Sequence, residues 1–135
     1  MGLLSEEEEK MVLIIGGAYQ GKLRYARKEY PEIGWVDGRE CGEEDLSVFQ
    51  GIHHFHAYIE RMMREGRCVD DLAGRISLRN PEVVIISDEI GYGIVPVDPF
   101  EREYREMTGR ICTELAADAK KVCRVVCGIG TVIKG

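Results

Sequence analysis

The sequence predicts an α/β fold in which helices cover both faces of a mostly parallel sheet, giving three layers. Short apolar runs bounded by turn signals alternate with helical stretches in the order β-α-β-α-α-β-α-β. The first run also leads directly into a Gly-x-x-x-x-Gly-Lys loop, so we expect a fold of the P-loop type. The runs that we expect to form buried strands are 12–15, 33–36, 83–86 and 122–126.

Proline residues mark the ends of the shorter helices. Pro31 ends the helix expected over 22–29, directly after the loop. Asn80-Pro81 separates the helical segment 71–78 from the third strand, because the residue before a proline disfavours the helical conformation.

The longest helix is expected to begin after Asp98 and to reach about Asp118. Pro99 follows Asp98, and Glu101 lies three residues further on, a pattern typical of a helix N-terminus. Gly109 lies inside this helix and should weaken it by about 1 kcal/mol relative to alanine. We interpret Gly109 as a residue that permits close packing.

The loop after the first strand predicts a site for nucleotide phosphates. Its backbone N–H groups can surround an anion, Lys22 supplies a cation for the β- and γ-phosphates, and the helix that follows offers its positive end. Leu23 stands where a serine or threonine usually ligates Mg²⁺, so phosphate binding is better supported than metal-dependent chemistry. The alternative is a glycine-rich turn with a surface lysine. The candidate phosphate-binding residues are Gly16, Gly17, Ala18, Tyr19, Gln20, Gly21, Lys22 and Leu23.

A second candidate element follows the third apolar run, where Asp88 and Glu89 resemble the end of a Walker-B strand. One carboxylate there can hold Mg²⁺, directly or through water, and the other can act as a base. The carboxyl ends of parallel strands share one edge, so we expect both residues to meet the loop in one cleft. The alternative is an acidic turn that caps the strand. The segment after it is a candidate substrate loop, with Gly91, Tyr92, Gly93 and Pro96.

All three histidines lie in the stretch 44–65, which we interpret as one helix. At about 100° per residue, His56 falls on the apolar arc of this helix, His53 on its border and His54 on the polar face. A core-facing His56 with two surface or boundary neighbours is the favoured interpretation. Metal ligation by His53 and His56 would need a third ligand, which no spacing indicates. A nucleophilic role stays open.

Composition limits the partners and the compartment. With 135 residues we expect one domain over 11–135, preceded by a flexible acidic lead over 1–10. The net charge of −6 argues against nucleic acid and anionic membrane, which call for a basic patch. No apolar run is long enough to span a membrane and the N-terminus is acidic, so we expect a cytoplasmic protein.

The odd number of cysteines, without framework spacing, indicates reduced thiols. We expect Cys123 and Cys127 to lie buried on the same face of the last strand. The five cysteines are Cys41, Cys68, Cys112, Cys123 and Cys127.

Three blocks of the sequence match longer motifs: 16–23, 88–96 and 104–116. They are similar, in order, to Gly-Gly-Ala-Arg-Ser-Gly-Lys-Ser, to Asn-Glu-Val-Gly-x-Gly-Val-Val-Pro and to Phe-Arg-Asp-x-x-Gly-Arg-x-Asn-Gln-x-Leu-Ala. These motifs belong to the adenosylcobinamide kinase/adenosylcobinamide-phosphate guanylyltransferase family of cobalamin biosynthesis. The chain resembles this family over 11–30 and 82–134.

The resemblance implies that GTP or ATP binds at the loop with Mg²⁺ and that the aminopropanol hydroxyl of cobinamide, a corrinoid, is phosphorylated. It also implies a homo-oligomer, since the family assembles as trimers. Family members carry, after the second strand, a segment whose histidine takes GMP covalently. That segment is not recognisable here, so the nucleophile is unknown and the role is not assigned to His53, His54 or His56.

The leading hypothesis is a shortened cobinamide kinase-like phosphotransferase, which Asp88, Glu89 and the loop after them favour. Guanylyl transfer is less well supported, because the histidine segment is absent. A non-catalytic nucleotide-binding or regulatory homologue with a degenerate loop is the alternative that Leu23 favours. An unrelated small-molecule kinase that uses the same loop is a third.

Overall fold

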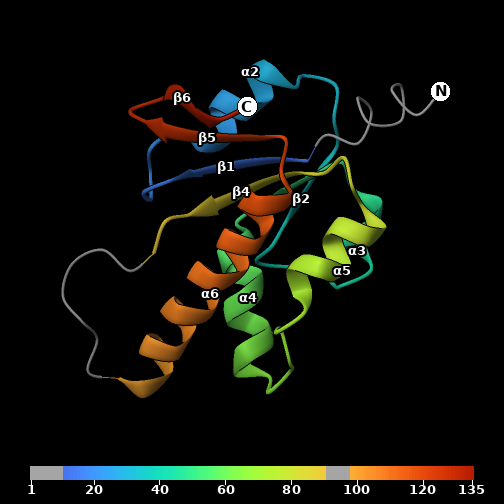
Figure 1. Cartoon of the computed structure of the whole chain (residues 1–135), viewed down its shortest axis with the longest axis vertical. Coiled ribbons are helices and arrows are strands. Elements are labelled where there is room, and N and C mark those ends of the chain that lie inside the picture. The colour runs from blue at the N-terminus through green and yellow to red at the C-terminus, as the bar shows by residue number, and fades with distance from the viewer. Residues whose placement is uncertain (1–10, 91–97) are drawn as a thin grey trace.

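A computed structural model describes residues 11–90 and 98–135 (Figure 1). The expected lead over 1–10 and the candidate substrate residues Gly91, Tyr92, Gly93 and Pro96 lie outside the described residues. The strands are β1 (Val12–Gly16), β2 (Trp35–Asp37), β3 (Gly51–His53), β4 (Val84–Asp88), β5 (Lys121–Val126) and β6 (Ile129–Lys134). The helices are α2 (Lys22–Glu29), α3 (Asp45–Val48), α4 (Phe55–Arg64), α5 (Leu72–Arg79) and α6 (Pro99–Asp118).

The strands form one sheet in the order β2-β3-β4-β1-β5-β6. Neighbouring strands from β2 to β5 are parallel, and β6 pairs with β5 in the antiparallel direction. Alternate residues of β1 enter two separate cores: Leu13 packs with α4, α5 and α6, whereas Val12 and Ile14 pack with α2. Helices therefore cover both faces, as Figure 1 shows. The predicted α/β fold with a mostly parallel sheet is confirmed.

Two strands, β3 and β6, are absent from the sequence-based prediction. The stretch 44–65 is not one helix. Helix α3 ends at Val48, and strand β3 of the sheet follows it before α4 begins at Phe55. With three residues, β3 is too short to show a period of two. The other missed strand is β6, which is exposed along most of its length. It follows a tight turn in which Cys127 and Gly128 both have positive φ, as in hairpins.

The predicted ends of α2 and α6 agree with the structure. Helix α2 spans 22–29, and α6 runs from Pro99 to Asp118. A side-chain oxygen of Asp98 accepts a hydrogen bond from the Phe100 N–H at 2.9 Å, the predicted N-cap. Gly109 differs from the prediction: a Cβ built there meets no described atom within 4 Å. Gly109 therefore faces open space and does not serve close packing.

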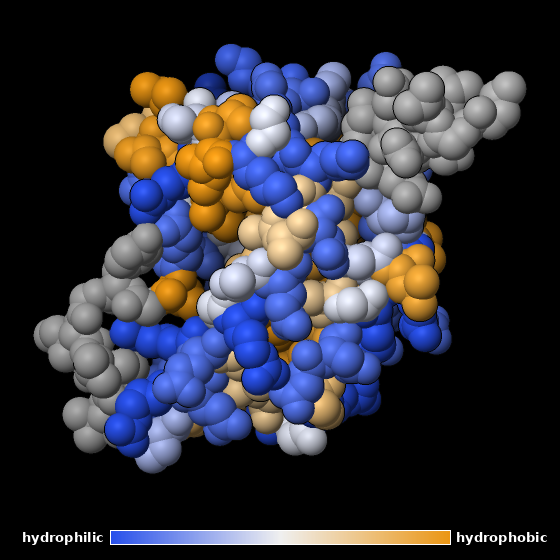
Figure 2. Space-filling view, viewed as in Figure 1, coloured by the Kyte–Doolittle hydropathy of each residue, from blue (hydrophilic) through white to orange (hydrophobic). Residues whose placement is uncertain are grey.

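One of the two cysteines that were expected to be buried in the strand over 122–126 is exposed. Cys123 is buried in β5, as expected, but Cys127 lies in the turn after the strand and is exposed. In the hydropathy view, hydrophobic side chains gather over β5 and β6 (Figure 2). Exposed large residues here are Val126, Ile129, Val132 and Ile133. Among the described residues, no helix has the length and apolarity needed to cross a membrane.

Candidate active site

The candidate site lies at the carboxyl edge of the sheet, where four neighbouring strands end. Gly16 of β1 aligns with Asp88 of β4, and Asp37 of β2 aligns with His53 of β3. A cavity of about 440 Å³ opens above these strand ends. Its described lining comprises Ala18, Tyr19, Gln20, Gly21, Lys22, Leu23, Arg24, Arg39, His53, His54, His56, Ile86 and Asp88.

Residues 18–23 of the predicted phosphate loop form one rim of this cavity, whereas Gly16 and Gly17 are not among its lining residues. Gly21 begins α2 with φ of 81°, a conformation that suits glycine, and no side chain caps the free N–H groups of the helix. A Cβ on Gly16 would come 2.5 Å from the carbonyl oxygen of Val125. Only glycine therefore allows the end of β1 to pack this closely against β5.

The turn between β5 and β6 supports the tip of the loop. The Gly128 N–H donates to the backbone oxygen of Gln20, and the Cys127 N–H donates to its side-chain oxygen, both at 2.7 Å. Tyr19 projects fully into solvent beside this anchor. The turn between β5 and β6 therefore helps to hold the conformation of the loop.

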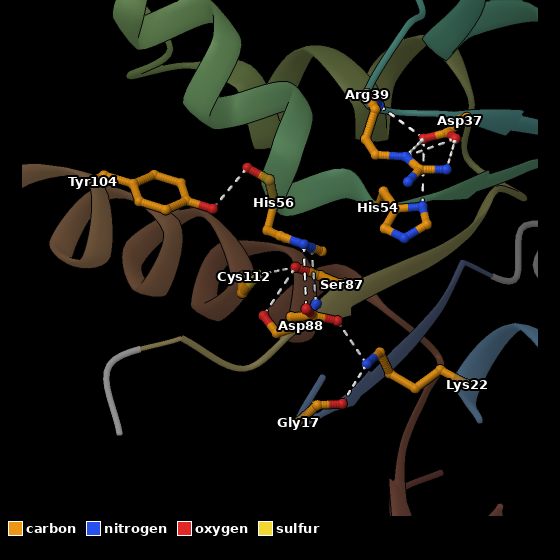
Figure 3. A network of polar contacts seen from close by, with 10 residues as sticks. All are labelled: Gly17, Lys22, Asp37, Arg39, His54, His56, Ser87, Asp88, Tyr104 and Cys112. Carbon is orange, nitrogen blue, oxygen red and sulfur yellow. Dashed lines mark hydrogen bonds and ion pairs between the residues drawn. The ribbon is translucent and has the colours of Figure 1, made fainter. Parts of the chain in front are cut away.

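Lys22 and Asp88 form an ion pair across the cavity (Figure 3). The Lys22 Nζ lies 2.6 Å from Asp88 Oδ1 and donates to the Gly17 carbonyl oxygen, also at 2.6 Å. Only 7% of the lysine side chain is exposed. The lysine of the glycine loop is thus held by a carboxylate and a backbone oxygen, and any anion that bound it would compete with Asp88.

His56 holds the other side of Asp88. The backbone N–H of Asp88 donates to His56 Nδ1 at 3.0 Å, and His56 Nε2 lies 3.3 Å from Asp88 Oδ2. Burial lowers the pKa of His56, and it outweighs the opposing effect of Asp88. With Nδ1 accepting, the neutral ring carries its hydrogen on Nε2, which faces the carboxylate.

The predicted placement of the three histidines on one helix is wrong. His56 lies in the first turn of α4 and faces Asp88 instead of the core, His53 ends β3, and His54 lies between them with φ of 54°. All three line the first cavity, together with the glycine loop. The prediction missed strand β3, which interrupts the expected helix. A glycine at 51 was the available signal, since a Cβ there would clash with the Trp35 ring.

Glu89 points away from the lysine that Asp88 contacts. Its carboxylate pairs with Arg124 at 2.8 and 3.0 Å. It lines a second cavity of about 260 Å³ between the end of β4 and α6. Asp88 lines both cavities, whereas Glu89 lines only the second. The two predicted carboxylates therefore do not share the first cavity. The second cavity is lined by Ile15, Asp88, Glu89, Ile90, Thr108, Gly109, Cys112 and Thr113.

Asp37 and Arg39 belong to the same edge and were missed from the sequence. Nη2 and Nε of Arg39 donate to Asp37 Oδ2 at 2.7 and 3.0 Å. Burial alone would raise the pKa of Asp37, but the hydrogen bonds from Arg39 outweigh it and lower the pKa to about 2. The signal available was position: Asp37 ends the second apolar run, and the ends of parallel strands gather at one edge.

Comparison with known proteins identifies the family. A sequence model described as cobinamide kinase / cobinamide phosphate guanyltransferase matches residues 52–133, more than half of the chain. The chain belongs to this cobinamide kinase/guanyltransferase family. The resemblance seen in its motifs is thereby confirmed.

Two curated relatives in the cobinamide kinase/guanyltransferase family share a stretch of 53 residues with the chain at 45% identity. Both are bifunctional adenosylcobalamin biosynthesis proteins CobU, one from Escherichia coli and one from Salmonella typhimurium. The stretch covers 39% of this chain and 29% of each relative, so the chain matches less than a third of their length.

The family match takes in Asp88, α6 and all three histidines, but it begins at residue 52, after the glycine loop over 16–23. Membership therefore rests on β3 to β6. The role of Gly16 to Leu23 is a separate question, which the geometry of the loop addresses.

Proposed function

We propose that the chain binds a purine nucleoside triphosphate, GTP or ATP, in the first cavity and transfers its terminal phosphoryl group to the hydroxyl of a cobinamide-type corrinoid. The observation that carries the proposal is the ion pair between Lys22 and Asp88 at the mouth of the glycine loop. Phosphoryl transfer depends on positioning and charge stabilisation, which a loop, a lysine and a carboxylate supply.

The steps follow from the contacts that Lys22, Asp88 and His56 make with one another. Phosphate oxygens accept hydrogen bonds from the loop N–H groups and draw Lys22 away from Asp88 Oδ1. The released carboxylate keeps its contact with His56 through Oδ2. Asp88 can then accept the proton of an incoming hydroxyl, and Lys22 neutralises the charge that develops on the transferred group.

The residues fit a loosely held Mg²⁺. Asp88 is the one carboxylate among the described residues of the first cavity, and Leu23 offers no oxygen where the motif places a hydroxyl. Mg²⁺ usually keeps several waters and takes one or two carboxylates, so Asp88 would hold it through water. When bound, the ion would neutralise phosphate charge and align the terminal phosphate. We place no ligand on Glu89, which pairs with Arg124.

We place the acceptor hydroxyl in the second cavity. Asp88 lines both cavities, so an alcohol in the second cavity would approach the same carboxylate that Lys22 contacts from the first. The terminal phosphate and the acceptor hydroxyl would then meet at one base.

Leu23 favours a second candidate function, a non-catalytic nucleotide-binding or regulatory protein. Its side chain lines the first cavity and packs against the apolar cluster under α2. Such a protein would bind nucleotide and transfer nothing.

One assay separates the candidates: γ-labelled GTP or ATP is incubated with the protein, Mg²⁺ and cobinamide, and the products are separated by chromatography. Labelled cobinamide phosphate, absent with Asp88→Asn, is the expected result. Tight nucleotide binding without labelled product would favour the non-catalytic function. No nucleotide binding in calorimetry would contradict both.

A homo-oligomer, trimeric as in the family, is also proposed. The exposed apolar residues of β6 support it, because an edge strand with such side chains can pair with a second copy. Sedimentation equilibrium tests it, and a monomer at micromolar concentration would contradict it. Cytoplasmic location stays a prediction.

A further inference from the structure

A cluster of potential metal ligands lies at the carboxyl ends of β2 and β3. One ligand atom from each of Asp37, His53 and His54 lies within 4.8 Å of the other two. Strand pairing fixes the first two side by side, and the positive φ of His54 turns its ring back toward them. We propose that these three residues bind a divalent transition metal of the zinc class.

The two imidazoles lack the partners that buried nitrogens normally have. Nδ1 of His53 and Nδ1 of His54 are both buried, and neither has a hydrogen-bond partner within residues 11–90 and 98–135. Leaving such buried groups without a partner is unfavourable, because they lose their bonds to water on folding. His54 Nδ1 also faces Asp37 Oδ1 at 3.4 Å. A nitrogen lone pair and a carboxylate oxygen attract each other only with a proton or a cation between them, and a metal ion satisfies all three groups.

Arg39 leaves room for this role. Its Nη2 donates to Asp37 Oδ2 at 2.7 Å, on the carboxylate edge away from His54, and its Nε hydrogen is shared between both oxygens at 3.0 and 3.2 Å. Its backbone N–H takes one lone pair of Oδ1 at 2.8 Å. These three donor groups of Arg39 use three of the roughly four lone-pair sites of the carboxylate, which leaves one for a metal ion. Metal-binding carboxylates are themselves commonly held by such hydrogen bonds.

The ligand types select the metal class. Two imidazoles and one carboxylate form the ligand set of open zinc sites, whereas Mg²⁺ and Ca²⁺ prefer oxygen ligands. Two ligands of one zinc ion span at most about 4 Å, so the cluster must close slightly. The His54 side chain is 36% exposed and can rotate to do so. His53 and His54 line the first cavity, so the fourth position opens to solvent or to an anion there.

The site is distinct from the proposed Mg²⁺ position at Asp88. It uses other residues on other strands, and metal binding to it needs no nucleotide. Failure of the kinase proposal would leave this one standing, and the reverse also holds.

Cobalt(II) absorption and zinc calorimetry test the site. The parent protein carries Cys68→Ser and Cys127→Ser, because these two cysteines are exposed and thiolates bind the same metals. Asp37→Asn, His53→Asn and His54→Asn each remove one ligand, and asparagine tolerates the positive φ at position 54. His56→Asn is the matched control, a cavity histidine outside the cluster.

We expect one equivalent of Co²⁺ to give the intense visible bands of a four-coordinate site in the parent and in His56→Asn. Each ligand variant should lose these bands and bind Zn²⁺ on the order of 100-fold more weakly. Circular dichroism checks folding, and Asp37→Asn, which keeps the side-chain volume, decides the question if a histidine variant unfolds. Absence of the bands in the parent, or Zn²⁺ affinity unchanged in Asp37→Asn, would overturn the proposal.

Discussion

The Nζ of Lys22 lies 2.6 Å from Oδ1 of Asp88, joining the glycine loop after β1 to the end of β4 (Figure 3). The two residues are far apart in sequence but come from adjacent, parallel strands. Because the lysine is almost fully buried, its charge has two available partners, this carboxylate or a bound anion. Binding of an anion to Lys22 should therefore change this pair more than any other described contact of the site.

Lys22→Ala should abolish tight binding of GTP and ATP. Breaking a buried charge pair costs about 3–5 kcal/mol, so we expect a loss in affinity of at least about 100-fold. Calorimetry with each nucleotide measures it. Lys28→Ala, at the exposed far end of α2, is the control and should bind normally. Unchanged affinity in Lys22→Ala would remove the loop from the site.

Leu23→Ser should strengthen the dependence of nucleotide affinity on Mg²⁺. The natural protein lacks the hydroxyl that usually ligates the ion, so its own dependence should be weak. Titrations of GTP with and without Mg²⁺ compare the two proteins, and Leu23→Ala separates the gain of an oxygen from the loss of the leucine. A strong dependence in the natural protein, unchanged by Leu23→Ser, would mean that other residues hold the metal.

Gly109→Leu should weaken binding of the acceptor without affecting the nucleotide. Gly109 lines the second cavity, and the new side chain would extend into it without meeting a described atom. Replacing a glycine in a helix interior also stabilises the helix by about 1 kcal/mol. We therefore expect a higher KM for cobinamide, an unchanged Kd for GTP and an equal or higher Tm.

Gly74→Leu in α5 is the matched control, since its Cβ also meets no described atom and it lines neither cavity. An unchanged KM in Gly109→Leu would place the acceptor elsewhere.

Acidification should destabilise the protein partly through His56. Burial lowers the pKa of His56 in the folded state, so below pH 6.5 the unfolded chain binds more protons than the folded one. This contribution to stability is present above pH 6.5 and is lost as the pH falls. One full proton corresponds to about 1.4 kcal/mol per pH unit.

Urea unfolding of His56→Asn between pH 5 and 7 should give a shallower slope of unfolding free energy against pH. The slope should not vanish, because burial lowers the pKa of His53 too. A slope equal to that of the natural protein would show that His56 is not buried as described.

No guanylyl adduct should form on His56. Both ring nitrogens are engaged with Asp88, Nδ1 by the backbone N–H and Nε2 by the carboxylate, so neither is placed to attack a phosphate. Intact-protein mass spectrometry after incubation with GTP and Mg²⁺ checks this. A mass increment of GMP that disappears in His56→Asn would prove the expectation wrong.

Local signals in the sequence determined much of this protein. The glycine loop, Lys22 and the Asp98 N-cap of α6 were found because each depends on residues within a few positions of one another. The fold class followed from the alternation of apolar runs and helices. Asp88 was found because its strand, with four apolar residues before it, is long enough to be seen.

Only the tertiary structure decided what lies opposite the loop. Strand β3 has three residues and is largely buried, so no periodicity distinguishes it from a helix. Once it is present, His53 and His56 lie at the edge of the sheet beside Asp37 and Asp88. Which strand ends are neighbours depends on the order β2-β3-β4-β1, and strand order is set by packing between distant segments, not by any local pattern.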